Sequence, residues 1–177
     1  MDAILRTKGA FVITHHSDAA KDVALQVSRN LCQYFAADTK IKGDFEEAKA
    51  AKGANLVSVA IGANFPASAH GFQSAFEILE DRIEISDRGE LHAYPMTNHL
   101  AAIWLRPLPD ERLELVVWGA DEEGLDIAAR LVPLTSGTGQ PDFVIADKTT
   151  LWKGLEGTLA LGYFDAWWNV SRASHFT

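Results

Sequence analysis

The chain has 177 residues, of which 47% are hydrophobic, which suffices for the core of one domain but not for two independent ones. Its 24 acidic and 16 basic residues give a formal net charge of -8. Because nucleic acids and anionic membrane surfaces are bound by concentrated basic faces, we expect neither as a partner. Residues 1–8 lack the apolar run of a signal peptide, and no stretch of the sequence is apolar over the length of a membrane span.

The first part of the chain has a strand pattern followed by a helix pattern. Residues 9–14 form a short run rich in β-branched side chains, which predicts a buried strand. Apolar side chains then recur at helical spacing over residues 20–35, with Ser17 or Asp18 placed to cap the helix. The next segment, 38–53, is polar and has too few large apolar groups for a buried face. We expect a loop there with some surface helix.

The middle of the chain predicts a strand, a short helix and a hairpin. Residues 55–61 are apolar and β-branched, which is typical of a second buried strand. A short helix is expected over 68–79. Alternating apolar and polar residues at 82–86 and 90–94 predict a β-hairpin, in which Gly89 supplies the positive φ of the turn.

The last part of the chain continues the alternation. Residues 101–106 and 113–118 predict two further strands, and a helix follows in which Asp121 acts as the amino-terminal cap. Another strand is expected at 142–146. The terminal segment, 147–177, is rich in glycine and tryptophan and has no regular pattern.

Strands that alternate with helices predict an α/β fold with a largely parallel sheet covered on both faces. We expect a three-layer, flavodoxin-like or Rossmann-like arrangement in which the central hairpin forms a mixed edge. Ligands bind such sheets at the carboxyl ends of the strands. The turns expected there contain the candidate ligand-binding residues His15, His16, Asn64 and Asp121.

The sequence contains no catalytic signature. Residues 119–124 have the glycine spacing of a phosphate loop, but acidic residues stand where phosphate oxygens would lie, so an ordinary helix start is favoured. The nucleophile-elbow pattern is absent, and Ser58 lies in the middle of a predicted strand. A small hydrolase that uses Ser17 with His15, His16 or His70 stays open as an alternative. The scattered histidines predict no metal site, and we expect no cofactor.

The carboxyl-terminal aromatic residues are the most unusual feature of the sequence. Trp152, Trp167 and Trp168 would suit an aromatic platform for a ligand, but large rings with little polar rim favour core packing or docking onto another domain. Asn169 begins the triplet Asn-Val-Ser, an acceptor for N-glycosylation in exported proteins. The lone Cys32 falls within an apolar helical pattern, so we predict a buried, inert thiol.

Several stretches resemble a known group of proteins: residues 55–64, 118–133 and 139–145, and the Gly- and Trp-rich end. They look like the carboxyl-terminal domain of large fungal secreted proteins that carry a prolyl-oligopeptidase-like α/β-hydrolase domain. The resemblance covers roughly residues 9–174. It implies that the chain is a fragment of a larger protein, with the hydrolytic serine in a separate domain.

These observations favour a non-catalytic accessory or interaction domain associated with an esterase or peptidase-like α/β-hydrolase. The neighbouring hydrolase domain is the expected partner, and the resemblance implies secretion of the whole protein. A small-molecule binding module that uses the turns at Gly62 and Gly119 is a further alternative.

Overall fold

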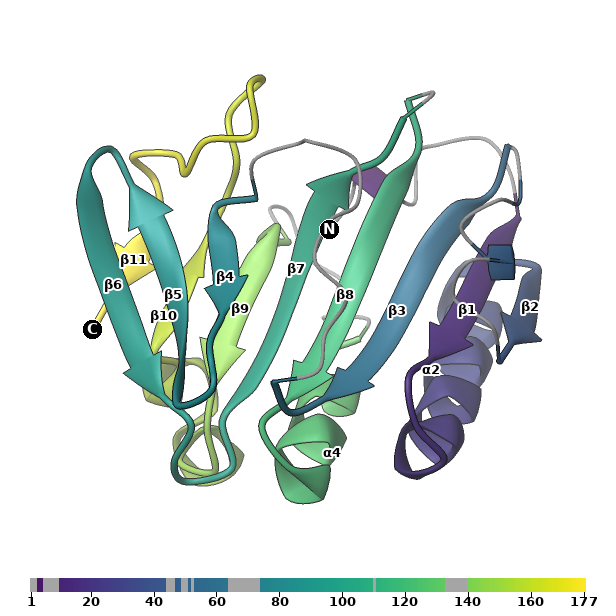
Figure 1. Cartoon of the computed structure of the whole chain (residues 1–177), viewed down its shortest axis with the longest axis horizontal. Coiled ribbons are helices and arrows are strands. Elements are labelled where there is room, and N and C mark those ends of the chain that lie inside the picture. The colour runs from purple at the N-terminus through teal and green to yellow at the C-terminus, as the bar shows by residue number, and fades with distance from the viewer. Residues whose placement is uncertain are drawn as a thin grey trace.

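A computed structural model describes residues 3–4, 10–43, 47–48, 51, 53–63, 74–109, 111–132 and 140–177. Its centre is an eight-stranded mixed sheet with the strand order β11-β10-β9-β7-β8-β3-β1-β2 (Figure 1). The strands of this sheet are β1 (Phe11–His15), β2 (Thr39–Lys42), β3 (Asn55–Ile61), β7 (Ala101–Pro107), β8 (Leu113–Gly119), β9 (Phe143–Ala146), β10 (Ala160–Gly162) and β11 (His175–Phe176).

Only one half of the sheet is parallel. Strands β2, β1, β3 and β8 run in the same direction, whereas β7 is antiparallel to both of its neighbours, β8 and β9. Strands β10 and β11 extend the sheet beyond β9 by further antiparallel pairing. The expectation of a mostly parallel sheet was therefore wrong. The change of direction is possible because β7 and β8 are joined by a short connection and need no crossover helix.

Helices cover one face of the sheet. Helix α2 (Ala19–Phe35) and helix α4 (Glu122–Arg130) lie side by side behind the parallel strands (Figure 1). Their inward side chains, such as Val27 and Leu125, pack on Ile13, Val57 and Val117 in one fully buried cluster. Two shorter elements, α5 (Thr150–Lys153) and the 3-10 helix η1 (Gly154–Gly157), follow β9.

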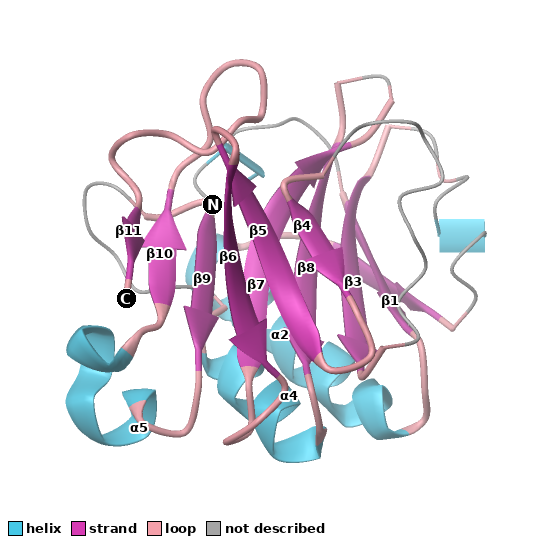
Figure 2. Cartoon of the chain, turned by 60° about the vertical axis from the view of Figure 1, so that its left-hand side comes forward, coloured by secondary structure: helices cyan, strands magenta, loops and turns pink. Residues whose placement is uncertain are grey.

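A second, three-stranded antiparallel sheet covers part of the other face (Figure 2). It consists of β4 (Phe76–Ile78), β5 (Arg82–Asp87) and β6 (Glu90–Pro95). Phe76 stacks on Trp104 of β7 with ring centroids 4.9 Å apart and meets Phe143 of β9 edge-on at 5.3 Å. The molecule therefore has a layer of helices, a mixed sheet and a small antiparallel sheet. A flavodoxin-like or Rossmann-like fold would instead have helices on both faces of the main sheet.

Most strands and both long helices lie where the sequence predicted them, and the hairpin is confirmed as β5 and β6. Its two-residue turn has positive φ at both Arg88 (48°) and Gly89 (91°), which matches the twist of the paired strands. The hairpin was expected to form a mixed edge of the main sheet. It belongs instead to the separate small sheet, which packs across the main one. This happens because Ile83 and Ile85 bury their side chains against the rings of the main sheet.

Three local predictions were wrong. Residues 76–78, assigned to a helix over 68–79, form strand β4, and residues 64–73 lie outside the described part. Strand β2 lies in the segment expected to be a loop. Cys32 is exposed, not buried. It follows the buried Leu31 on α2, and one step along a helix rotates a side chain by about 100°, here toward solvent.

Candidate functional site

The turns after β1, β3 and β8 lie together at one edge of the sheet, because these neighbouring strands are parallel (Figure 1). The amide of His16 donates to the carbonyl oxygen of Val59 at 3.1 Å, and the amide of Gly62 donates to that of Gly119 at 2.9 Å. The sequence thus predicted correctly that these three turns meet. Asn64 and His70 lie outside the described residues.

The polar groups of the turn after β1 form hydrogen bonds at the amino end of α2. Nδ1 of His15 lies 3.0 Å from the carbonyl oxygen of Ser17, and the Ser17 hydroxyl accepts the amide hydrogen of Ala20 at 3.2 Å. Within the described ranges, no imidazole is hydrogen-bonded to the Ser17 hydroxyl. This hydroxyl therefore serves as a helix cap in the structure.

The half-buried His16 lies near a buried group of charges. Desolvation lowers the pKa of its imidazole, and the nearby Arg106 and His15 lower it too, whereas the carboxylate of Glu114 opposes them. The net shift favours a neutral ring near pH 7. A neutral imidazole is suited to sharing hydrogen bonds inside the fold.

The buried group itself consists of Ser58, Arg106 and Glu114 on the face of the sheet opposite the helices. Arg106 and Glu114 are paired across β7 and β8, and the guanidinium donates to both carboxylate oxygens through Nε and, at 2.9 Å, through Nη2. The Ser58 hydroxyl donates to the same carboxylate at 2.5 Å. Ser58 and Glu114 are fully buried and Arg106 is 6% exposed. The sequence predicted burial of Ser58 but not this cluster, since its members come from three separate strands.

Asp121 caps α4, as predicted, and also joins a small surface network. One of its oxygens accepts the amide hydrogen of Gly124 at 2.7 Å, and the other lies 2.9 Å from Nδ1 of His99. Nε2 of His99 lies 3.2 Å from Glu123, which also contacts Lys148 at 3.4 Å. These contacts use Asp121 to hold the loop before β7 against α4. The described part of the chain holds no group of three His, Cys, Asp or Glu side chains suited to a metal ion.

Two glycines set how closely α4 approaches this edge. A Cβ atom on Gly119 would lie 2.1 Å from the backbone nitrogen of Leu125, and one on Gly124 would lie 2.4 Å from the carbonyl oxygen of Leu100. Both clashes are with backbone atoms, which a rotamer change cannot relieve. The glycine spacing of 119–124 therefore serves helix packing, in agreement with the interpretation of this stretch as an ordinary helix start.

A patch of exposed apolar side chains, the α5 patch, consists of Leu151, Trp152 and Leu155. These side chains are 44%, 80% and 67% exposed. Their segment lies at the same end of the sheet as the carboxyl ends of the parallel strands (Figures 1 and 2). Trp152 was predicted from the sequence to be an interaction residue, whereas the two leucines, which lie within five residues of each other, were not.

Hydrogen bonds at both of its ends hold the α5 patch in shape. The amide of Thr149 donates to the Asp147 carboxylate at 2.7 Å, and the other oxygen of that carboxylate accepts from Asn98 at 2.7 Å. The Thr150 hydroxyl donates to the carbonyl oxygen of Gly157 at 3.1 Å, and that of Thr158 donates to Leu155 at 2.7 Å. The patch is thus presented by a backbone that is already ordered.

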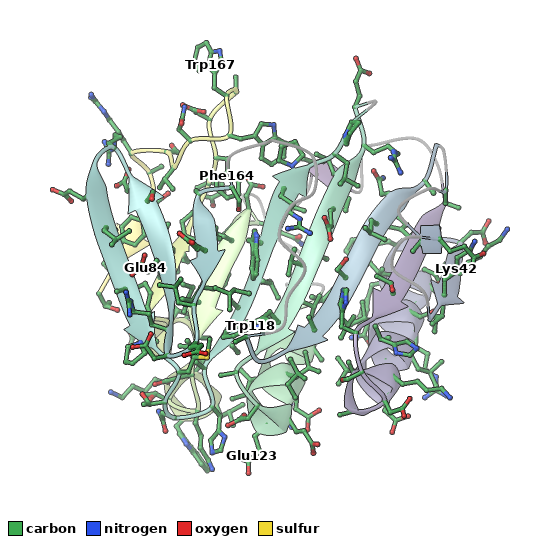
Figure 3. All side chains as sticks on the ribbon, in the orientation of Figure 1. Lys42, Glu84, Trp118, Glu123, Phe164 and Trp167 are labelled. Atoms are coloured by element: carbon green, nitrogen blue, oxygen red, sulfur yellow. The ribbon has the colours of Figure 1, made fainter. Side chains whose placement is uncertain are left out.

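Trp167 lies at the opposite end of the molecule from α5 (Figures 2 and 3). Trp167 is 81% exposed, whereas Trp168 is half-buried and packs on Phe164 with ring centroids 5.6 Å apart. The three tryptophans singled out in the sequence therefore do not form one platform. The short strand β10 leads the chain away from the α5 end of the sheet, so Trp167 lies far from Trp152 (Figure 2).

The loop that carries these two tryptophans, the Asp165 loop (165–169), is organised by one carboxylate. Oδ1 of Asp165 accepts the amide hydrogens of Trp167 at 2.8 Å and of Asn169 at 2.9 Å, and the Asp165 amide donates to the Asn169 carbonyl at 2.8 Å. Desolvation would raise the pKa of Asp165, but the bonds from Asn169 and Trp167 outweigh it and hold the pKa below its ordinary value.

This shift predicts that the Asp165 loop loosens at low pH. A carboxylate whose pKa is lowered by folding stabilises the folded loop above its ordinary pKa, and this stabilisation is lost as the pH falls through the lowered value. In an NMR titration, we expect the amide signals of Trp167 and Asn169 to move together, with a midpoint below that of an ordinary aspartate. Asp165→Asn should abolish the shared titration. A midpoint at or above the ordinary value would contradict this account.

An open groove of about 670 Å³ lies between the Asp165 loop and the turn of the β5–β6 hairpin. Its lining includes Trp168, Asn169 and Arg172 on one side and Arg88 on the other. The guanidinium of Arg88 already forms two bonds with the Asp87 carboxylate, at 2.7 and 2.9 Å. The groove therefore combines an indole ring with several hydrogen-bonding groups.

No helix in the described parts of the chain is long and apolar enough to cross a membrane.

No protein-family model matches the chain. The chain is 41% identical, over 179 aligned residues, to an uncharacterized secreted protein of Arthroderma benhamiae. The alignment covers 99% of this chain but only 19% of that protein, so the chain spans about a fifth of the relative's length. The expected similarity to a large fungal secreted protein is thereby confirmed: nearly all of this chain is similar to one part of a much longer secreted protein.

Proposed function

We propose that this chain is a non-catalytic accessory domain of a larger secreted polypeptide and that it docks on a neighbouring domain through the α5 patch. The neighbour, by the resemblance of the sequence, is an α/β-hydrolase domain of the prolyl-oligopeptidase type. Secretion is part of the proposal because the relative from Arthroderma benhamiae bears that description. The observation that carries the proposal is the exposure of Leu151, Trp152 and Leu155 on an ordered turn.

The α5 patch has the properties of a docking site. Large apolar side chains that gather on a surface mark sites of interaction, and tryptophan is enriched among the residues that dominate binding energy. Because Asp147, Thr150 and Thr158 already order the segment, little conformational entropy is lost when a partner covers it. The occupant we infer is another domain of the same polypeptide, since the relative is about five times as long as the aligned region.

The direct test measures binding between this domain and the rest of its polypeptide, produced as separate chains. Trp152→Ala should weaken the association about 30-fold or more, as expected for a central tryptophan worth about 2 kcal/mol. Trp167→Ala is the matched control, because Trp167 is equally exposed but lies at the other end of the molecule. Calorimetric titration of both variants separates a specific docking site from a general loss of apolar surface.

A second measurement uses the intact polypeptide. Oxidative footprinting should show Trp152 protected in the whole polypeptide and reactive in the isolated domain, with Trp167 reactive in both. Equal oxidation of Trp152 in the two samples would contradict the proposal. So would a reading frame that encodes no neighbouring domain, and a neighbour that is not a hydrolase would overturn that part alone.

A further inference from the structure

Asn169 begins the only Asn-x-Ser/Thr triplet in the 177-residue sequence. The structure places it on the surface. Asn169 is exposed and Ser171 is partly exposed, whereas Val170 between them is buried and forms an isolated bridge with Phe164. A folded domain can accommodate a sugar on an acceptor asparagine only if the side chain of that asparagine is exposed.

The side-chain amide of Asn169 is only weakly engaged. Among the described residues, its single hydrogen bond is to Oδ2 of Asp165 at 3.4 Å, close to the limit for such a bond. The loop is held instead by backbone bonds of Asn169 to the same aspartate, at 2.8 and 2.9 Å. Substitution on the amide nitrogen therefore leaves the geometry of the loop intact.

The groove beside Asn169 offers a place for an attached sugar. Trp168 lines it with an indole ring, and the C–H face of a pyranose ring packs well on such a surface, while Arg172 and Ser171 provide hydrogen-bonding groups.

We propose that Asn169 carries an N-linked glycan and that its first sugars lie in the groove between the Asp165 loop and the β5–β6 turn. The donor is a lipid-linked oligosaccharyl diphosphate. The amide nitrogen of Asn169 forms a bond to C1 of the first sugar, the bond from C1 to the diphosphate oxygen breaks, and the amide loses one proton to a base of the transferase. The lipid diphosphate is the leaving group.

This proposal rests on the secretion included in the proposed function, but on none of its docking contacts. Trp167, two residues before Asn169, lies at the opposite end of the molecule from α5 (Figures 2 and 3). An attached glycan therefore leaves the docking surface open and marks the opposite end as the one that faces solvent.

The test exports the full chain from a eukaryotic host by means of a fused leader peptide, so that its result does not depend on the natural route of secretion. We expect a mass increase that is removed by peptide N-glycosidase, with aspartate left at position 169. Asn169→Gln and Ser171→Ala should each lose the mass increase, whereas Ser171→Thr should keep it. Secreted, folded wild-type protein without a glycan would overturn the proposal.

Placement of the sugars in the groove has its own readout. Oxidative footprinting of Trp168 should be slower in the glycosylated protein than after enzymatic removal of the glycan, with Trp152 unchanged as the internal control. Equal oxidation of Trp168 in the two samples would overturn the placement and leave attachment at Asn169 standing. Neither result bears on binding through Trp152, so failure of this proposal and failure of the docking proposal are distinguishable.

Discussion

Gly119→Ala and Gly124→Ala are each expected to destabilise the domain by about 3 kcal/mol or more, or to prevent folding. The added methyl group would lie 2.1 Å from the nitrogen of Leu125 in the first variant and 2.4 Å from the oxygen of Leu100 in the second. Relief requires moving α4 away from β8, which would break the buried packing of Leu125. Urea denaturation followed by circular dichroism measures the loss.

Gly43→Ala is the matched control for these two variants. A Cβ atom at Gly43 would find its nearest neighbour, Nε2 of His15, at 3.8 Å, which is an ordinary contact. We expect a change within about 0.5 kcal/mol, as for most surface substitutions. A Gly119→Ala variant as stable as the control would show that α4 is not held against β8 in the way described.

Glu114→Leu is expected to cost about 3–5 kcal/mol, because it removes the carboxylate to which the buried guanidinium of Arg106 donates. The Ser58 hydroxyl loses its acceptor at the same time. Replacing both partners, as Arg106→Leu with Glu114→Leu, removes the buried guanidinium as well and should recover much of the loss. Chemical denaturation of the single and double variants gives the coupling between the two side chains.

The matched control is Glu123→Leu, which removes a carboxylate whose side chain is 64% exposed and should change stability by less than about 1 kcal/mol. A double variant as unstable as Glu114→Leu would contradict the account, since the cost would then come from the shape of the site and not from the loss of this ion pair. The cluster of Ser58, Arg106 and Glu114 is part of the buried core of the sheet.

Prediction of the candidate sites from the sequence succeeded where the signal was local. Asp121 was correctly assigned as a cap, because capping depends on residues three positions apart. The cluster of Arg106 and Glu114 was missed, since burial of a charged pair depends on which strands become neighbours. The leucines of the α5 patch were missed because apolar residues in a segment without regular pattern do not show which of them face solvent.

The strands β1, β3, β7, β8 and β9 and the helices α2 and α4 were determined by the sequence itself, because apolar periodicity, caps and β-branched runs act over a few residues. Tertiary structure decided the rest. Phe76 joins a strand because its ring stacks on Trp104, and the hairpin leaves the main sheet because its isoleucines are buried against that sheet. Trp152 and Trp167 lie at opposite ends of the molecule because β10 leads the chain away from α5, and the direction of that strand does not depend on local residue type.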